Sequence, residues 1–421
     1  MWQFISDGLN FLTSQSGVSL FNLFWFVIIF EVPRYLLSFL SAAVLSVRSE
    51  RERPGRSHVG RVSVVIAGHN EEDSIARCVV SLREQSRPPD QIIVVSDGST
   101  YRMPAKLREL QNRGLIQEAH CTQVRGGKSA ALNLAVGRTT GDIVVNVDCD
   151  CTFDRHAIRD IVEPFADHEV GAVSGNIIVR NPDASLITAC QAIEYLISIS
   201  QGKQAADMTN QVSCISGAFG AFRRVVMQRV GGLDAGGGED LDVTLKLRTA
   251  GWKAVFAPDA ICYTDVPETF PALVRQRFRW ERDAVHLRYR KHRGLLDPFS
   301  ARFNVTELLH ELDFIIFNVV AAAVFPLYVI WLFVAYGGLA PIILMAAQVG
   351  MWGLDSITFL LAAWMTPKAN AVKLLIFLPA YSPFYGLLMR VVRLAAYIQE
   401  WVFQASYHDT FVPRKVQKVR K

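Results

Sequence analysis

The distribution of apolar residues divides the chain into two strongly apolar ends and a middle part with the pattern of an α/β domain. Residues 18–47 form an apolar stretch that is long enough to cross a bilayer core, which takes about 20 apolar residues. Two further runs of sufficient length lie at 312–336 and 341–365. The pattern therefore predicts an integral membrane protein whose middle part folds outside the bilayer.

The third apolar segment near the C-terminus, residues 374–389, contains Pro379 and Pro383 and runs into Arg390 and Arg393. Three spans in this region would place the C-terminus outside the cell. The final residues, PRKVQKVRK, are basic and typical of the cytoplasmic side. We expect a third span, and a re-entrant or interfacial segment is the alternative.

Basic residues around the first apolar stretch indicate its orientation. Residues 1–17 contain no Lys or Arg, whereas four arginines follow the stretch: Arg48, Arg51, Arg53 and Arg56. This asymmetry predicts an external N-terminus and a cytoplasmic middle part, with the chain in the plasma or inner membrane. A cleavable signal peptide does not fit, because the apolar run is too long and the basic residues follow it. Within the stretch, Glu31 and Arg34 predict either an ion pair beside Pro33 or a contact to a passing polymer.

From Val62 onward, short β-rich runs (VSVVIA, IIVVS, IVVNV) alternate with helical spacing, first at residues 71–83. Alternating apolar strands and helices predict a parallel sheet covered on both faces, in which ligands bind at the C-terminal ends of strands. Polar side chains follow these ends: Asn70 with Glu71, Asp97 and Asp148. We expect a nucleotide to bind there.

The second half of the middle part runs from about 171 to 267 and contains a helix that begins near Glu239, with Gly251 as its natural stop. After it, residues 270–293 are amphipathic, basic and aromatic, a composition suited to the membrane surface. The expected domains are an N-terminal segment with one transmembrane helix (1–50), a cytoplasmic catalytic domain (51–269), interfacial helices (270–311), and a C-terminal membrane region with a basic tail (312–421).

Composition narrows the function classes. The chain has 421 residues, 51% of them hydrophobic, and a net charge of +5. The modest charge and the absence of a basic block interleaved with aromatic residues argue against a nucleic-acid partner. Seven cysteines without a C-x-x-C pair and nine histidines without an H-E-x-x-H motif argue against a zinc enzyme.

The strongest candidate for metal binding is the pair Asp148 and Asp150, which are separated by one residue at the end of a strand and therefore point to the same side. Two carboxylates together with a nucleotide diphosphate suit Mg²⁺ or Mn²⁺. Turn or cap chemistry is the alternative. Asp97 is expected to contact the base or ribose, and an Asx-turn is its alternative. Lys128, in GGKSAALNLA with Asn133, can meet phosphate, although an ordinary loop explains it equally well.

Two further motifs follow. Glu239 and Asp240 come after three glycines and open a helix, where a carboxylate can take a proton from an acceptor hydroxyl. Favourable charge at a helix N-terminus, about 0.3–1 kcal/mol, explains them as well. Gln276, Arg279 and Trp280 share one helix face, where Trp can stack on a sugar and Gln and Arg can hold diphosphate. An interfacial anchor is the alternative, but it leaves the carboxylates upstream unexplained.

Together these motifs resemble the family 2 glycosyltransferases with a GT-A fold, particularly the membrane-embedded processive synthases of cellulose, chitin oligosaccharides, hyaluronan and poly-N-acetylglucosamine. The resemblance covers Val62 to about Arg293 and the membrane layout on both sides. The matching motifs are Asn70-Glu71-Glu72, Asp97-Gly98-Ser99, Lys128 with Ala131-Leu132-Asn133, Asp148-Cys149-Asp150, Gly238-Glu239-Asp240, and Gln276-Arg277-Phe278-Arg279-Trp280 (Q-x-x-R-W). The chain departs from the family at Ala67-Gly68-His69, where a proline followed by an aromatic residue is more usual.

The resemblance implies an α/β fold of the GT-A (Rossmann-like) type inserted between transmembrane helices, and an inverting transfer from a UDP-sugar. It implies Asp240 as the base, Asp150 with Asp148 as ligands of Mg²⁺ or Mn²⁺, and Ser216-Gly217-Ala218 beside the acceptor. The residues expected to bind substrate are Asn70, Glu71, Asp97, Lys128, Asp148, Glu239, Gln276, Arg277, Arg279 and Trp280.

The resulting hypothesis is a processive β-glycosyltransferase that makes an exported polysaccharide, with UDP-GlcNAc favoured over UDP-glucose by analogy alone. One alternative is a non-processive enzyme that adds a single sugar to a lipid or lipid-linked acceptor. Another is a transporter or scaffold with an inactive transferase-like domain, which is disfavoured because no acidic position is missing. Expected partners are the donor, the acceptor, membrane lipids and an accessory export or regulatory subunit, but no nucleic acid.

Overall fold

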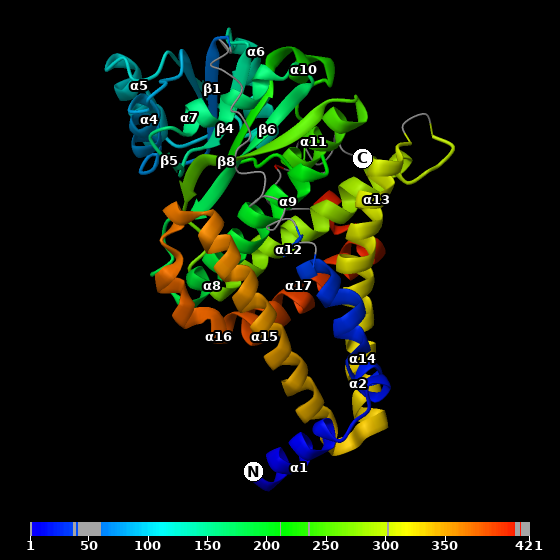
Figure 1. The fold of residues 1–421 in the computed structure, drawn as a ribbon. Coiled ribbons are helices and arrows are strands. Elements are labelled where there is room, and N and C mark those ends of the chain that lie inside the picture. Colours follow the sequence, from blue (N-terminus) through cyan, green and yellow to red (C-terminus); the bar gives the residue numbers. More distant parts are fainter. Residues whose placement is uncertain are drawn as a thin grey trace.

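The computed structural model describes residues 2–36, 39–40, 60–210, 212–234, 236–300, 303–408 and 413. An α/β domain lies at one end of the molecule, and apolar helices from both ends of the sequence project from it together (Figure 1). The four arginines after the N-terminal stretch and the basic tail, apart from Pro413, lie outside the described residues. The α/β domain is thus inserted between two apolar parts, as the sequence predicts.

Within the described residues, eight strands form one mixed sheet in the order β3-β2-β1-β4-β7-β6-β8-β5. Their bounds are β1 Val62–Gly68, β2 Gln91–Asp97, β3 Glu118–Thr122, β4 Ile143–Asp148, β5 Thr152–Phe153, β6 Val170–Val179, β7 Phe219–Arg223 and β8 Lys253–Thr264. Strands β1 to β4 are parallel, which confirms the predicted parallel sheet for this half. Strand β7 runs antiparallel to both β4 and β6, so the second half is mixed.

Helices cover both faces of this sheet (Figure 1). Their bounds are α4 Ile75–Arg83, α5 Arg102–Asn112, α6 Lys128–Arg138, α7 Ala157–Val162, α8 Leu186–Glu194, η3 Tyr195–Gln201, α9 Gly202–Met208, α10 Arg224–Arg229, α11 Glu239–Thr249, α12 Phe270–His286 and η4 Leu287–Lys291. Successive side chains of a strand point to opposite faces. Accordingly, Val64 and Ile66 of β1 join the core beneath α4, α5 and α7, whereas Val65 joins the core beneath α6, α10 and α11.

The apolar parts are α-helices interrupted by π-helical segments. Their bounds are α1 Trp2–Thr13, α2 Gly17–Phe26, η1 Val27–Glu31, α13 Val305–Phe314, η6 Ile315–Val320, α14 Ala321–Tyr336, α15 Ala340–Met365, α16 Leu378–Ala380, η10 Tyr381–Gly386 and α17 Leu387–Phe403. Three helical stretches of the described chain are long and apolar enough to cross a membrane: Gly17–Leu36, Val305–Met365 and Ala371–Phe403. Helices α14 and α15 form a hairpin that turns at Gly337, where φ is +52° (Figure 1). Both helices end where the runs predicted from the sequence end, at Tyr336 and Met365.

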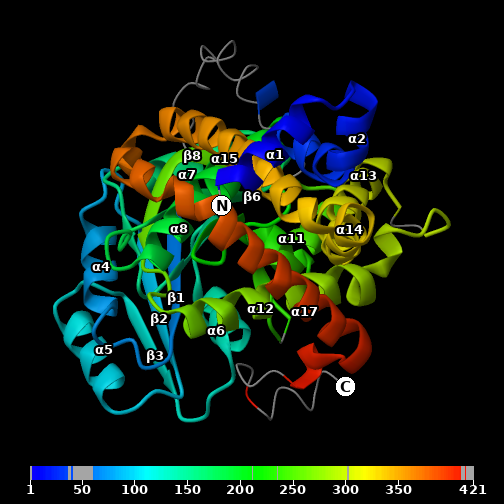
Figure 2. The same ribbon diagram turned by 90° about the horizontal axis from the view of Figure 1, so that it is seen from below.

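The last apolar segment, which ends in α17, runs in a different direction from α14. Seen from below, α14 is viewed end-on, whereas α17 extends across the view (Figure 2). Helix α17 packs along α12, and its Arg393 and Tyr397 contact the Glu281 carboxylate at 2.9 and 2.7 Å. Length and apolar composition still qualify this segment as a candidate span. Whether this segment crosses the bilayer or lies at its surface stays a prediction.

The predicted ion pair in the N-terminal stretch is present, with a second and closer partner. Glu31 is buried, its carboxylate lying 4.0 Å from Arg34 Nη1 and 2.7 Å from Arg390 Nη1 of α17. A buried carboxylate between two arginines ties the N-terminal helix to the last apolar segment. The polymer-contact hypothesis for these residues stays a prediction.

Candidate active site

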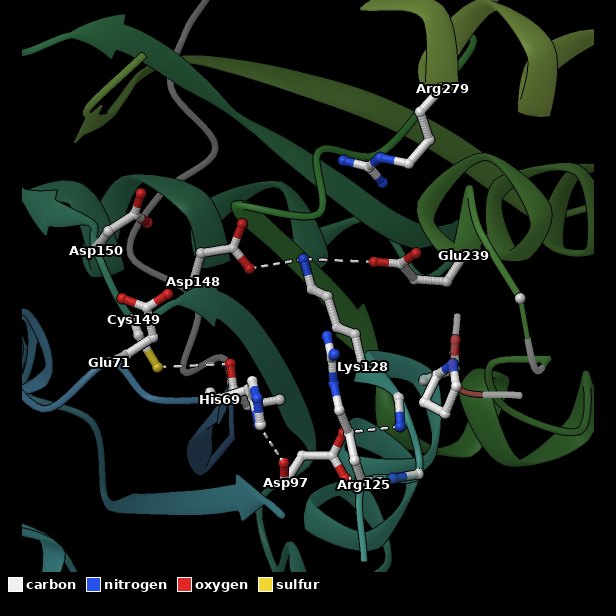
Figure 3. A pocket seen from close by; sticks show the side chains of 17 residues that line it. His69, Glu71, Asp97, Arg125, Lys128, Asp148, Cys149, Asp150, Glu239 and Arg279 are labelled. Atoms are coloured by element: carbon white, nitrogen blue, oxygen red, sulfur yellow. Dashed lines mark hydrogen bonds and ion pairs between the residues drawn. The ribbon is translucent and has the colours of Figure 1, made fainter. Parts of the chain in front are cut away.

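A cavity of about 320 Å³ opens at the C-terminal ends of β1, β2 and β4 (Figure 3). Seven of the residues expected to bind substrate or metal line it: Glu71, Asp97, Lys128, Asp148, Asp150, Glu239 and Arg279. They come from the ends of β2 and β4, from the loops after β1 and β4, and from α6, α11 and α12, and they are spread over more than 200 residues of sequence. Because the parallel strands end at the same sheet edge, the fold brings these side chains together.

Asp97 fixes the glycine turn that precedes α6. Its two carboxylate oxygens accept hydrogen bonds from the backbone N–H groups of Gly126 and Gly127, at 2.6 and 2.7 Å. Such bonds to an ionised acceptor are stronger than those between neutral groups. Gly98, which follows Asp97, has φ +60°, and a Cβ there would lie 2.5 Å from the Arg125 backbone nitrogen. Asp97 therefore lines the cavity and also holds its opposite wall in place.

Asn70 joins two loops beside the cavity and is not among the cavity-lining residues. It adopts a left-handed conformation (φ +58°), accepts a hydrogen bond from the Thr100 N–H at 2.8 Å and donates its own N–H to Ser99 Oγ at 3.0 Å. The neighbouring His69 lines the cavity and donates from Nδ1 to the Asp97 carbonyl oxygen at 2.7 Å. All three residues at which the chain departs from the family pattern, Ala67, Gly68 and His69, thus line the cavity.

Asp148 and Asp150 both face the cavity, with Glu71 beside them (Figure 3). Burial and then the charge of Asp148 raise the pKa of Asp150. Burial and then the charges of Asp150 and Asp148 raise the pKa of Glu71. This crowding of negative charge is what a bound cation would relieve.

The donor set fits a hard divalent cation. No group of three or more His, Cys, Asp or Glu side chains arranged around one point occurs among the described residues. Mg²⁺ is commonly bound through one or two carboxylates plus substrate phosphates and water, without a complete protein cage. Asp148 and Asp150 meet that requirement once a diphosphate supplies the remaining oxygen ligands.

Lys128 is the first residue of α6 and lies between two carboxylates. Its Nζ is 2.6 Å from Asp148 Oδ1 and 3.4 Å from Glu239 Oε1 (Figure 3). Burial alone would lower the pKa of Lys128, but the charges of Asp148 and Glu239 raise it above the ordinary value. The side chain is therefore a fixed cation at the centre of the cavity.

Helix α11 begins at Glu239, after three glycines, of which Gly236 and Gly238 have φ +138° and +72°. Glu239 lines the cavity. Asp240 lies outside the cavity lining and beside the Ser216-Gly217-Ala218 loop. Asp240 Oδ2 accepts a hydrogen bond from the Gly217 N–H at 3.3 Å, and its Oδ1 accepts one from the Leu241 N–H at 2.8 Å. The loop expected beside the acceptor therefore contacts the expected base.

The Q-x-x-R-W element lies on α12, and its side chains go to different places. Arg279 points into the cavity (Figure 3). Arg277 is buried away from the cavity, 2.6 Å from the Glu194 carboxylate, with its guanidinium 4.4 Å from the Trp280 ring centre. Gln276 is partly buried, and its Oε1 has no hydrogen-bond partner within the described part of the chain. Trp280 is 38% exposed.

Among the cavity-lining residues to which sequence reasoning assigned no site role are His69, Arg125 and Pro413. Arg125 directly precedes the glycine pair, and that position is a signal that could have found it. Pro413 comes from near the C-terminus, and a Cβ on Gly127 would lie 3.4 Å from its ring. Nothing in the local sequence indicates that contact.

A family model described as "Glycosyltransferase like family 2" matches residues 60–282, which is more than half of the chain and contains every cavity-lining residue except Pro413. The chain belongs to this glycosyltransferase family. A second model, described as "Chitin synthase", matches residues 236–392, from the start of α11 into α17. The family and the enzyme class predicted from the sequence are confirmed.

Curated relatives of this glycosyltransferase extend the comparison. The chain is 29% identical over 233 residues to an N-acetylglucosaminyltransferase of Rhizobium meliloti (strain 1021), a match covering 52% of this chain and 55% of the relative. It is 31% identical over 224 residues to a poly-beta-1,6-N-acetyl-D-glucosamine synthase of Staphylococcus aureus (strain MSSA476), covering 52% and 53%. The chain thus spans about half the length of the curated relatives it matches.

Among solved structures, the glycosyltransferase resembles the mannosyltransferase PcManGT from Pyrobaculum calidifontis, solved in complex with GDP-Man and Mn²⁺. The TM-score is 0.54 at 20% identity, and the match covers 91% of this chain and 99% of the other. At that identity the likeness concerns the fold. The predicted GT-A fold is confirmed.

Proposed function

We propose that this chain is a membrane-embedded, inverting β-glycosyltransferase that polymerises N-acetylglucosamine from UDP-GlcNAc into an exported polysaccharide. One observation carries the proposal: Asp148 and Asp150 face Glu239, the first residue of α11, across a single cavity, with Lys128 between them. The names of the two curated relatives support N-acetylglucosamine as the sugar. UDP-glucose is the alternative donor.

In this reaction Asp240 is the general base. The acceptor hydroxyl oxygen attacks the anomeric carbon of the donor sugar while Asp240 takes the hydroxyl proton, and the bond between that carbon and the diphosphate oxygen breaks. UDP leaves with the bonding electron pair, and attack from the opposite face inverts the anomeric configuration. In this structure the Gly217 and Leu241 N–H groups donate hydrogen bonds to the Asp240 carboxylate.

Positive side chains of the cavity wall stabilise the negative charge that develops on the leaving diphosphate. Lys128 and Arg279 both reach into the cavity (Figure 3) and are assigned this role. Asp148 and Asp150 would hold Mg²⁺ or Mn²⁺, which supplies Lewis-acid stabilisation of the same charge when bound. Asp97, Glu71 and Asn70 are assigned to the nucleoside side, where Asp97 also fixes the glycine turn.

On the acceptor side, Trp280 and the Ser216-Gly217-Ala218 loop are assigned to the terminal sugar of the growing chain. An indole ring offers a flat apolar face for a sugar ring. The Arg277 guanidinium against the Trp280 ring fixes the indole, so the ring is prepared for stacking before the acceptor arrives.

The proposed orientation places the α/β domain in the cytoplasm and the N-terminus outside. The N-terminal helix crosses once and the α14–α15 hairpin crosses twice, while α17 lies along α12 at the membrane surface. This arrangement returns the C-terminus to the cytoplasm. It therefore reconciles the basic tail with the positive-inside rule, which three C-terminal spans would not do.

The proposal is tested with the purified full chain in lipid nanodiscs, supplied with Mn²⁺ and each UDP-sugar in turn. The expected result is UDP release and a high-mass, glycosidase-sensitive product from UDP-GlcNAc. Asp240→Asn should reduce turnover by roughly 10²–10⁴-fold with unchanged thermal stability. A one-sugar adduct on lipid would replace processive synthesis with single addition. Wild-type turnover in the Asp240→Asn variant would refute the assignment of the base.

A further inference from the structure

Lys128 connects two motifs that lie far apart in the sequence. Its ammonium group contacts Asp148, at the end of β4, and Glu239, at the first residue of α11, with nitrogen–oxygen distances of 2.6 and 3.4 Å. The shorter contact is with a carboxylate expected to hold the metal. The longer contact is with the residue adjacent to the proposed base. A single side chain therefore bridges the metal carboxylates and the start of the base-bearing helix.

The backbone of Lys128 is fixed, so any rearrangement must involve its side chain or its partners. The two residues before it donate their N–H groups to the carboxylate of Asp97, at 2.6 and 2.7 Å. Lys128 itself starts α6, whose Ala131 and Leu132 are buried in the core. The lysine is thus anchored at its backbone and can swing only at its ammonium end.

The backbone before Glu239, the second partner of Lys128, can adopt more conformations than the backbone at Lys128. Helix α11 follows Gly236, Gly237 and Gly238, and glycine adopts positive and negative φ values with similar ease. In the described part of the chain, the Ser216–Ala218 loop bonds to Asp240 through the Gly217 N–H, and this contact of 3.3 Å is slightly longer than the normal range. The start of α11 can therefore respond to the loss of one contact to Glu239.

Gly217 makes the close approach of these groups possible. A Cβ at this position would lie 3.4 Å from Lys128 Nζ and 3.3 Å from Asp240 Oδ2. The ammonium group of Lys128 and the carboxylate of the proposed base therefore border the same small space. A shift of the Lys128 side chain changes the surroundings of Asp240 directly.

We propose that Lys128 is a latch, which holds the Glu239 end of α11 beside Asp148 until a divalent cation binds there. A cation on Asp148 repels the ammonium group, which moves away from that carboxylate toward the diphosphate and gives up Glu239. Asp240 thereby takes its working position only after the donor site is filled. The inference rests on the proposed function, because it assigns the metal to Asp148 and the base to Asp240.

The latch differs from a lysine that only binds phosphate in one measurable respect. If Lys128 only bound phosphate, adding metal without donor would leave the conformation of α11 unchanged. The latch links metal binding at Asp148 to the conformation of the start of α11 by a coupling free energy, and such coupling acts in both directions. Metal alone should therefore alter the start of α11, and removal of Lys128 should abolish that response.

The experiment uses the full chain in nanodiscs with Mn²⁺ alone and no nucleotide sugar. Amide hydrogen exchange is measured for the peptide covering residues 232–243, and Mn²⁺ binding is followed separately by electron paramagnetic resonance. In the wild type, saturating Mn²⁺ should speed exchange in this peptide by roughly five-fold or more, the lower end of typical coupling. In Lys128→Met and in Glu239→Gln, exchange should already be fast, and Mn²⁺ should change it by less than about twofold.

Two controls make the result specific. Lys106→Met removes an exposed lysine that pairs with Glu109 at 2.9 Å on α5, and it should behave as the wild type. Lys128→Arg keeps the charge and should keep a Mn²⁺ response.

Mn²⁺ binding with no change in α11 of the wild type, or an unchanged response in Lys128→Met, would overturn the latch alone. Absence of Mn²⁺ binding without nucleotide would overturn the latch, and absence of Mn²⁺ binding in the presence of UDP would overturn the proposed metal site as well.

Discussion

Arg277 of α12 and Glu194 of α8 form a buried ion pair, with 2.6 Å between guanidinium nitrogen and carboxylate oxygen. The same carboxylate accepts a hydrogen bond from the Tyr385 hydroxyl of η10 at 2.7 Å. The pair therefore joins the Q-x-x-R-W helix to the α/β domain and to the last apolar segment. It also positions Trp280, because the Arg277 guanidinium lies against that ring.

Glu194→Gln should destabilise the protein, because it leaves the buried Arg277 guanidinium without a countercharge. Breaking a buried ion pair from one side costs about 3–5 kcal/mol. The expected result is a clear drop in the unfolding temperature of the detergent-solubilised protein, whereas the exposed Glu84→Gln should leave it unchanged. The double variant Glu194→Gln with Arg277→Met should recover part of the loss. Equal unfolding temperatures for Glu194→Gln and wild type would contradict a structural role for the pair.

Gly217→Ala should reduce turnover with little loss of stability. The added methyl group would lie 3.3 Å from Asp240 Oδ2 and 3.4 Å from Lys128 Nζ, so one of these groups must move by a few tenths of an ångström. Small misplacements of reacting groups cost up to about 10²-fold in rate. Gly137→Ala is the matched control, because a Cβ there meets nothing within 4 Å. Initial rates of UDP release measure the effect, and full activity in Gly217→Ala would argue against this placement of the base.

Asp150→Asn should stabilise the protein in the presence of a chelator. The pKa of Asp150 is raised by burial and by Asp148, so this group favours folding at low pH and loses that contribution as pH rises through its folded pKa. Where the carboxyl is ionised in the folded protein it is therefore unfavourable, and its removal should add roughly 0.5–2 kcal/mol. Thermal unfolding in EDTA, followed as the pH rises above the ordinary pKa of an aspartate, should show a weaker decline with pH in the variant. Added Mn²⁺ should stabilise the wild type only, and equal stabilisation of the variant would remove Asp150 from the metal site.

Trp280→Ala should shorten the product more than it slows donor use. Loss of the indole removes the surface on which the terminal sugar stacks, an interaction of about 0.5–1.5 kcal/mol. The growing chain should then dissociate more often between additions. Trp280→Phe keeps a flat ring and should keep most of the product length. Size-exclusion analysis of the polysaccharide measures this, and long products from Trp280→Ala would exclude a stacking role.

Much of the site was predictable because strand ends are visible in the sequence. The apolar runs VSVVIA, IIVVS and IVVNV became β1, β2 and β4, and the acidic residues after them line one cavity. The start of α11 at Glu239 was likewise predictable from the preceding glycines. The assigned roles of these residues stay predictions.

The parts that the sequence did not indicate depend on long-range contacts. Strand β3 is an edge strand of residues Glu118–Thr122 with little apolar pattern, and it is held by its pairing with β2. The antiparallel direction of β7 depends on its neighbours β4 and β6. The Arg277–Glu194 pair joins residues 83 positions apart. The orientation of α17 follows from contacts such as Arg393 to Glu281, whereas its composition alone is that of a membrane span.

Helix α15 has 26 residues and is about 39 Å long. A hydrocarbon core is about 30 Å thick, so under the proposed orientation α15 must lean to cross it, as it leans relative to α14 in Figure 1. A thinner bilayer would increase that lean and displace the Met365 end of α15, which continues through α16 into α17 and so to α12. Under the proposed orientation, the lipid composition of the host membrane would thereby act on the helix that carries Arg279 and Trp280.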